Sequence, residues 1–177
     1  RMATERFDVL VSSDLPRALT TAQRIAGRTG HPIALDARLR ERNFGCCEGL
    51  TYGEMDHEFP GVFSQVRETD PDYVVPGGES RRQFHERIAS GFEHLAREHP
   101  GARVAVICHG GVLAALYRMA RGIAISTPYR IPIPNASYNE LERNSGAWSV
   151  TTWGDTAHLK PGTDPVFPRS PTNAPLI

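Results

Sequence analysis

An apolar run followed by a histidine and two glycines constrains the fold of this chain more than any other feature of the sequence. Val104 to Cys108 has the length and the apolar character of a strand that is covered on both faces, as parallel strands are. A helix is predicted directly after this run, and His109, Gly110 and Gly111 stand between the two. The sequence therefore predicts a buried parallel strand, an abrupt turn and a helix.

This strand-to-helix corner is chemically suited to an anion. Gly110 and Gly111 leave backbone N–H groups accessible that a side chain would cover, and a helix N-terminus concentrates N–H donors and partial positive charge. In open α/β sheets, ligands bind just beyond the carboxyl ends of strands, where His109 stands. On the local pattern alone, a structural histidine at the end of a strand explains His109 equally well.

A second strand, turn and helix are predicted at the start of the sequence. Residues 7–11 form an apolar run, residues 12–14 offer N-cap oxygens, and Pro16 fits a first helical turn. Apolar residues then recur at helical spacing as far as Gly30. Arg17 falls in the first turn, where a cation is unfavourable unless an anion binds beside it. The alternative is an arginine that faces solvent.

The remaining segments alternate between predicted strands and helices, as in an α/β domain. A capping box opens each of two helices, a short one before Pro60 and a longer one before Pro100. Arg81, Arg82 and Arg87 on the longer helix are assigned to a solvated face. In order, the expected elements are a strand at 33–36, a charged loop at 39–45, a helix after Thr51, a short helix near 62–66, a helix after Ser80 and a hairpin within 135–153.

Composition narrows the classes of protein to which this chain can belong. A length of 177 residues with 40% hydrophobic content fits one domain with a sizeable core. Lys and Arg number 20 and so do Asp and Glu, so neither nucleic acid nor a membrane surface is an expected partner. Three cysteines, two of them adjacent, give no disulfide framework and no metal-ligand spacing. We therefore expect a cytoplasmic protein without a membrane span or a signal peptide.

Arg17 and His109 would lie side by side if their two strands are near neighbours in one parallel sheet. The charged loop would then bring Glu41 across the top of both corners. An arginine presents a planar fork to phosphate oxygens, and a histidine can donate to developing charge or act as a nucleophile. A nearby glutamate can protonate a leaving alcohol. These residue types together predict phosphoryl transfer, which depends on positioning and charge stabilisation.

The segments that carry these residues resemble the histidine phosphatase superfamily, also called the phosphoglycerate mutase-like family. The resemblance implies a three-layer α/β/α sandwich around a mostly parallel sheet, with no metal or organic cofactor. It also implies that Arg17 binds phosphate, that Glu41 is the proton donor, that His109 is the second active-site histidine and that Gly110 is a backbone donor beside it. The matching segments are residues 12–22, 39–45, 48–49, 78–80, 107–112 and 154–159.

Two features depart from the family pattern. The family's nucleophilic histidine lies in an Arg-His-Gly motif at the end of the first strand, and the printed sequence contains no such motif. We expect the printed sequence to omit an N-terminal segment, because loss of a central strand would cost more than the ~5–15 kcal/mol stability of a typical domain. A truncation that a partner rescues is the alternative. Cys47 stands where family phosphatases often carry tryptophan, which affects the shape of the expected pocket.

From the resemblance we expect a phosphomonoesterase that hydrolyses a small phosphorylated metabolite through a phosphohistidine intermediate, with His109 protonated. Residues 1–160 would form the histidine phosphatase domain and residues 161–177 a Pro-rich C-terminal tail. A phosphoglycerate mutase is less favoured, because the segment between Glu41 and Gly78 is shorter than the insertion that the resemblance implies for true mutases of the family. A non-catalytic phosphate-binding or interaction module is the third possibility, since the Arg-His-Gly motif is absent. A homodimer is an expectation from the family alone.

Overall fold

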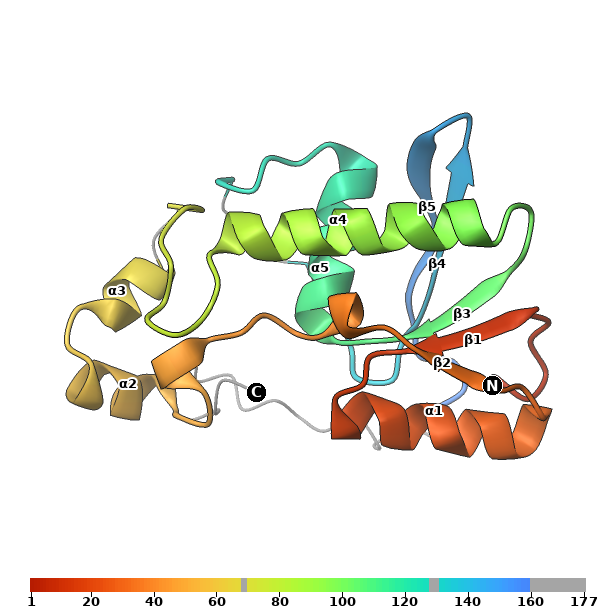
Figure 1. The fold of residues 1–177 in the computed structure, drawn as a ribbon, viewed down its shortest axis with the longest axis horizontal. Coiled ribbons are helices and arrows are strands. Elements are labelled where there is room, and N and C mark those ends of the chain that lie inside the picture. The colour runs from red at the N-terminus through yellow and green to blue at the C-terminus, as the bar shows by residue number, and fades with distance from the viewer. Residues whose placement is uncertain (68–69, 128–130, 160–177) are drawn as a thin grey trace.

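The computed structural model describes residues 1–67, 70–127 and 131–159 (Figure 1). The tail expected over 161–177 lies outside these residues. Short 3-10 helices at Ala37–Leu39 and Gly45–Cys47 interrupt the loop after β2. The main elements are β1 (Val9–Ser12), α1 (Pro16–Thr29), β2 (Ile33–Leu35), α2 (Tyr52–Glu58), α3 (Val62–Arg67), α4 (Arg81–Glu98), β3 (Val104–Ile107), α5 (Gly110–Arg121), β4 (Tyr138–Asn144) and β5 (Ala147–Asp155).

Strand β1 is the centre of a parallel three-stranded sheet with the order β2-β1-β3. Leu10 is paired with Ile33 of β2 on one side and with Ala105 of β3 on the other. Ser12 at the end of β1 lies opposite Ile107 at the end of β3. The two predicted strand-to-helix corners are therefore neighbours, level with each other at one edge of the sheet.

Helices cover both faces of this sheet, so the expected three-layer α/β/α arrangement is confirmed. Helix α1 packs on one face, while α4 and α5 lie on the opposite side, and α2 and α3 lie beyond the end of the sheet (Figure 1). Strands β4 and β5 form the expected antiparallel hairpin, and within the described residues no ladder joins this hairpin to the parallel sheet. Across the same residues, no helix is long and apolar enough to cross a bilayer.

Local sequence signals set several helix ends. Pro16 begins α1, and Gly30 ends it in the left-handed conformation at φ 77°, both as expected. The N-cap assignment to residues 12–14 is wrong, because the N-cap is Leu15 and no side chain caps it. Ser13 is instead buried against the neighbouring corner. Both expected capping boxes form, at the starts of α2 and α4.

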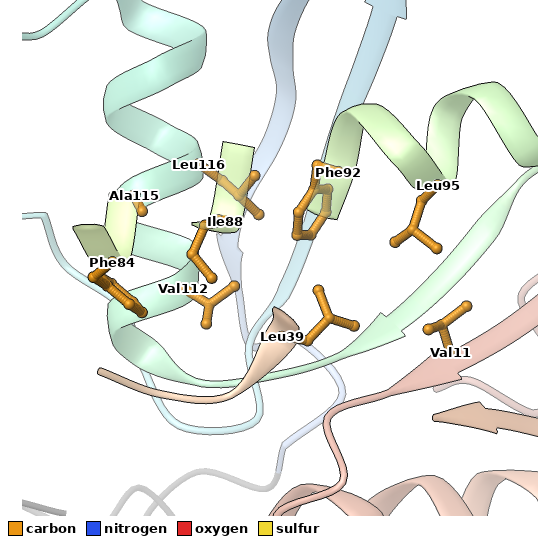
Figure 2. Close-up of a cluster of buried hydrophobic side chains, with 9 residues drawn as sticks. All are labelled: Val11, Leu39, Phe84, Ile88, Phe92, Leu95, Val112, Ala115 and Leu116. Carbon is orange, nitrogen blue, oxygen red and sulfur yellow. The ribbon is translucent and has the colours of Figure 1, made fainter. Parts of the chain in front are cut away.

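A cluster of buried apolar side chains lies between the sheet and the helices α4 and α5 (Figure 2). Leu39, from the loop after β2, is fully buried in this cluster. Burial of Leu39 anchors the start of the charged loop close to the carboxyl ends of the strands. The cluster consists of Val11, Leu39, Phe84, Ile88, Phe92, Leu95, Val112, Ala115 and Leu116.

The Cys47 side chain belongs to a second, smaller core. It is fully buried and packs with Met55 and Val75. Burial and the neighbouring thiol of Cys46, 3.8 Å away between sulfur atoms, raise the pKa of Cys47 to about 11. This cysteine therefore fills a core position in the structure.

Candidate active site

Arg17 and His109 meet where β1 and β3 end. Arg17 lies in the first turn of α1, and His109 is the N-cap of α5. Arg17 Nε donates to His109 Nδ1 at 3.2 Å. On the other side of the ring, His109 Nε2 lies 2.9 Å from the Oγ atom of the fully buried Ser13. Both ring nitrogens of His109 are thus held by residues that follow β1.

These contacts define the protonation state of His109. Because Arg17 Nε donates to Nδ1, the ring carries its proton on Nε2 and donates it to Ser13. Burial and then the positive charges of Arg17 and Arg87 lower the pKa of His109 to about 4, while the negative charge of Asp14 opposes them. In this geometry His109 is therefore neutral, since the ring is 7% exposed and lies near guanidinium groups. Its protonation beside a phosphoryl group stays a prediction.

Glu41 lies against the first turn of the same helix. Its Oε2 atom accepts a hydrogen bond from Gly111 N at 2.8 Å, and its Oε1 atom accepts one from Arg42 N at 2.9 Å. The side chain is buried at 8% exposure, and a carboxylate is favoured at the positive end of a helix. Because Gly111 follows His109 by two residues, the start of α5 brings Glu41 and His109 into one site.

The two glycines of the motif have different roles in this geometry. A Cβ atom at Gly111 would lie 2.1 Å from Glu41 Oε1, whereas a Cβ atom at Gly110 would meet nothing within 4 Å. Gly111 is therefore required by the close approach of the Glu41 carboxylate. Gly110 is the exposed first residue of α5, where its role as a backbone donor stays a prediction.

An ion pair that sequence reasoning missed joins the charged loop to the β1–α1 corner. Arg40 Nε donates to Asp14 Oδ1 at 2.7 Å, and Arg40 Nη2 also contacts the second carboxylate oxygen. This pairing lowers the pKa of Asp14 below its usual value. The alternating charges of the loop were the only available signal, and they do not identify a partner 26 positions away.

The three arginines assigned to a solvated face of α4 differ in the structure. Arg82 follows the expectation, because it pairs with Asp72 at the surface. Arg81 and Arg87 contradict it: Arg81 Nη1 donates to a carbonyl at 3.4 Å, and Arg87 donates to carbonyls of the loop that carries Glu41. Helical periodicity separates polar from apolar positions, but it does not reveal carbonyl partners that are distant in sequence.

Other ionisable side chains near the site have packing roles. Desolvation raises the pKa of the Cys108 thiol to about 12, which does not favour a nucleophilic thiolate. His85 is held neutral, because burial and then the charges of Arg118, Arg81 and Arg42 lower its pKa to about 4. Within the described residues, no group of three or more His, Cys, Asp or Glu side chains could hold a metal ion.

The fold and the site define an α/β/α sandwich protein whose arginine, histidine and glutamate converge at the carboxyl ends of parallel strands. Residues 1–156 match the family model of the histidine phosphatase superfamily (branch 1). The chain belongs to this superfamily. The match includes all three converging residues, although a family match does not by itself assign their roles.

Named relatives are about one-third identical to this chain, and a solved structure shares its fold. A metal-independent phosphoserine phosphatase from Arabidopsis thaliana is 34% identical over 158 residues, which cover 88% of this chain and 64% of that protein. Glucosyl-3-phosphoglycerate phosphatase from Mycobacterium tuberculosis is 35% identical over 150 residues, covering 80% of this chain and 66% of the relative. The mycobacterial enzyme in complex with inorganic phosphate superimposes with a TM-score of 0.72 at 31% identity, covering 86% of this chain and 79% of that one. The chain spans 64–68% of the length of the curated relatives that it matches first.

Substitution Gly111→Ala tests the close approach of Glu41 to α5. The new Cβ atom would force the carboxylate away from Gly111 N, and loss of this hydrogen bond to a charged group should lower the free energy of unfolding by about 1.5–3 kcal/mol. Gly27→Ala is the matched control, because a Cβ atom there meets nothing within 4 Å in the middle of α1. The control should gain up to about 1 kcal/mol. Urea unfolding measures the free energy of both variants. Equal effects of the two substitutions would contradict the close approach of Glu41 to Gly111.

The lowered pKa values of His109 and His85 predict a loss of stability in mild acid. Each folded-state pKa of about 4 lies below the ordinary value of 6.5, so the unfolded chain binds protons more readily between these values. The free energy of unfolding should therefore fall as the pH drops from about 6.5 to about 4 and be unaffected by these groups above that window. His109→Gln should flatten this slope in urea titrations at several pH values. The surface variant His57→Gln is the control, and an unchanged slope in His109→Gln would contradict the buried neutral ring.

Proposed function

We propose that this protein is a phosphomonoesterase that hydrolyses a small phosphorylated metabolite through a phosphohistidine intermediate. The observation that carries the proposal is the contact between Arg17 and His109, with Glu41 on the first turn of the same helix. Relatives named as phosphatases for phosphoserine and for glucosyl-3-phosphoglycerate support a phosphorylated metabolite as substrate. The free cysteines support a cytoplasmic protein.

Arg17 and His109 would hold the transferring phosphoryl group. The 3.2 Å contact from Arg17 to His109 Nδ1 is the longer of the two ring contacts, and it is the one that an anion would replace. Phosphate oxygens would then accept from the guanidinium of Arg17 and from a protonated Nδ1, while Nε2 keeps its bond to Ser13. A dianion beside the ring favours this second proton, since an opposite charge raises the pKa of a histidine. The N–H group of Gly110 would add a donor at the helix N-terminus.

Glu41 would act as the general acid and then as the general base. In the first step the protonated form of Glu41 gives its proton to the leaving oxygen as the P–O bond breaks and the phosphoryl group forms a bond to the nucleophilic histidine. In the second step the carboxylate takes a proton from water, the water oxygen bonds to phosphorus, and the phosphohistidine bond breaks. In-line transfer places that nucleophile on the side of the phosphoryl group opposite Glu41. The family's Arg-His-Gly motif, which supplies this histidine, has no counterpart in the printed sequence, so the test uses the full-length protein.

Two other functions make different predictions. A phosphoglycerate mutase would return the phosphoryl group to a second hydroxyl of the substrate, and the relative named phosphoglycerate mutase-like protein 4 is the observation in its favour. A non-catalytic module would bind phosphate esters and release no phosphate. Assays for phosphate release and for isomerised phosphoglycerate separate the three.

The homodimer and the domain boundary at residue 160 stay predictions.

Glu41→Gln tests the proposed proton transfer in the full-length protein. We expect kcat for an alkyl phosphate to fall by about 10²–10⁴-fold, because general acid–base catalysis contributes about this much. Affinity for inorganic phosphate, measured as product inhibition, should be largely retained, since the arginine and the histidine remain. Arg17→Ala should instead weaken the binding of inorganic phosphate, because it removes a phosphate ligand. Unchanged turnover in Glu41→Gln would remove Glu41 from the mechanism.

A further inference from the structure

Arg87 of α4 makes contacts that the proposed chemistry does not yet explain. Its Nη1 group donates to the carbonyl of Arg38 at 2.7 Å and to that of Arg40 at 2.9 Å. Its Nη2 group donates to the carbonyl of Glu41 at 3.3 Å. One guanidinium therefore binds three backbone carbonyls in the loop segment that ends at Glu41.

The rest of the Arg87 guanidinium pairs with Glu79. The Nη2 group contacts Glu79 Oε1 at 2.5 Å, and Nε donates to Oε2 at 3.2 Å. With these bonds all five N–H groups of the arginine are used. The two side chains are 25% and 17% exposed, so solvent competes little for the contacts.

Glu79 in turn holds the loop on the other side of Glu41. Its Oε1 atom accepts from Asn43 N at 2.9 Å, and its carbonyl accepts from Arg42 Nε at 3.2 Å. The side chains of Arg87 and Glu79 thus bind backbone groups of the loop from Arg38 to Glu41 and again at Asn43. Within the described residues no strand pairs with this loop, so side-chain bonds such as these help to fix its backbone.

We infer that Arg87, paired with Glu79, is the positioning residue that holds Glu41 at the start of α5 for proton transfer to the leaving group. The inference rests on the proposed phosphatase function. A carboxylate that must reach both Gly111 N and a leaving oxygen tolerates little displacement, since an error of about 1 Å can reduce a rate by about 10²-fold. A lysine at position 87 would supply one point charge in place of the planar fork and would satisfy only part of the set.

The test compares kcat/KM for two phosphate esters in the full-length protein. This parameter reports on the steps up to loss of the leaving group. A nitrophenyl phosphate releases a stable phenolate that needs no proton, whereas an alkyl phosphate such as glycerol 2-phosphate needs a general acid. For Arg87→Gln we expect kcat/KM to fall by about 10–100-fold with the alkyl ester and to change little with the nitrophenyl ester. With the alkyl ester, kcat/KM of Arg87→Lys should lie between the values for Arg87→Gln and for the unsubstituted protein.

Arg82→Gln is the matched control, because Arg82 lies on the same helix and pairs with Asp72 at the surface. It should behave like the unsubstituted protein with both esters. The double variant Glu41→Gln/Arg87→Gln should be no slower with the alkyl ester than Glu41→Gln alone, since residues that act through one group are not additive.

Equal losses with both esters in Arg87→Gln and Arg87→Lys would overturn the inference, because they would indicate a general effect on binding or folding. A double variant that is slower by the product of the single effects would overturn it as well. Failure of the unsubstituted protein to hydrolyse either ester would instead overturn the proposed function, and the role of Arg87 with it.

Discussion

The parallel pairing of β1 with β3 is the constraint on which the rest of the site depends. The ladder continues past the end of β1, where Ser13 N donates to the carbonyl of Ile107 at 2.9 Å. This last bond fixes Ser13 beside His109, and the helix that follows starts within reach of the ring. A shift of one residue in this register would turn each side chain of the strand to the opposite face of the sheet. The contact between Arg17 and His109 would then be lost.

Glu41 completes the site by a different physical route. It lies on a loop without regular pairing, and three sets of contacts hold that loop: Gly111 N at the start of α5, the Asp14–Arg40 pair and the Arg87–Glu79 pair. Burial of Leu39 anchors the loop in the core. The sheet fixes the two strand-to-helix corners, and side-chain contacts fix the loop. Arg17, His109 and Glu41 are therefore held in one defined arrangement. Rigid support of this kind is what proton transfer over a short distance requires.

Much of the fold could be predicted because its signals are local. Apolar runs gave the strands, capping boxes gave the starts of α2 and α4, and Gly30 gave the end of α1. Arg17, Glu41 and His109 could be singled out because each stands in a short motif at a chain turn. Their convergence followed from the rule that parallel strands present their carboxyl ends at one edge of a sheet.

The features that sequence reasoning missed depend on partners distant in sequence. Ser13 was predicted to offer an N-cap oxygen, whereas its side chain contacts His109, which lies 96 positions away in the sequence. The bonds from Arg87 to the loop carbonyls join residues 46 to 49 positions apart, and the periodicity along α4 cannot predict such bonds. The neutral state of His109 likewise follows from burial and nearby charges, which only the assembled structure defines.

A crystal structure of the full-length protein with bound inorganic phosphate tests the central claim most directly. The account predicts a phosphate ion at the junction of the two corners, accepting hydrogen bonds from the Arg17 guanidinium and from His109 Nδ1, with the Glu41 carboxylate beside it and the bond from His109 Nε2 to Ser13 retained. A phosphate ion bound elsewhere, with the Arg17–His109 contact intact, would contradict it.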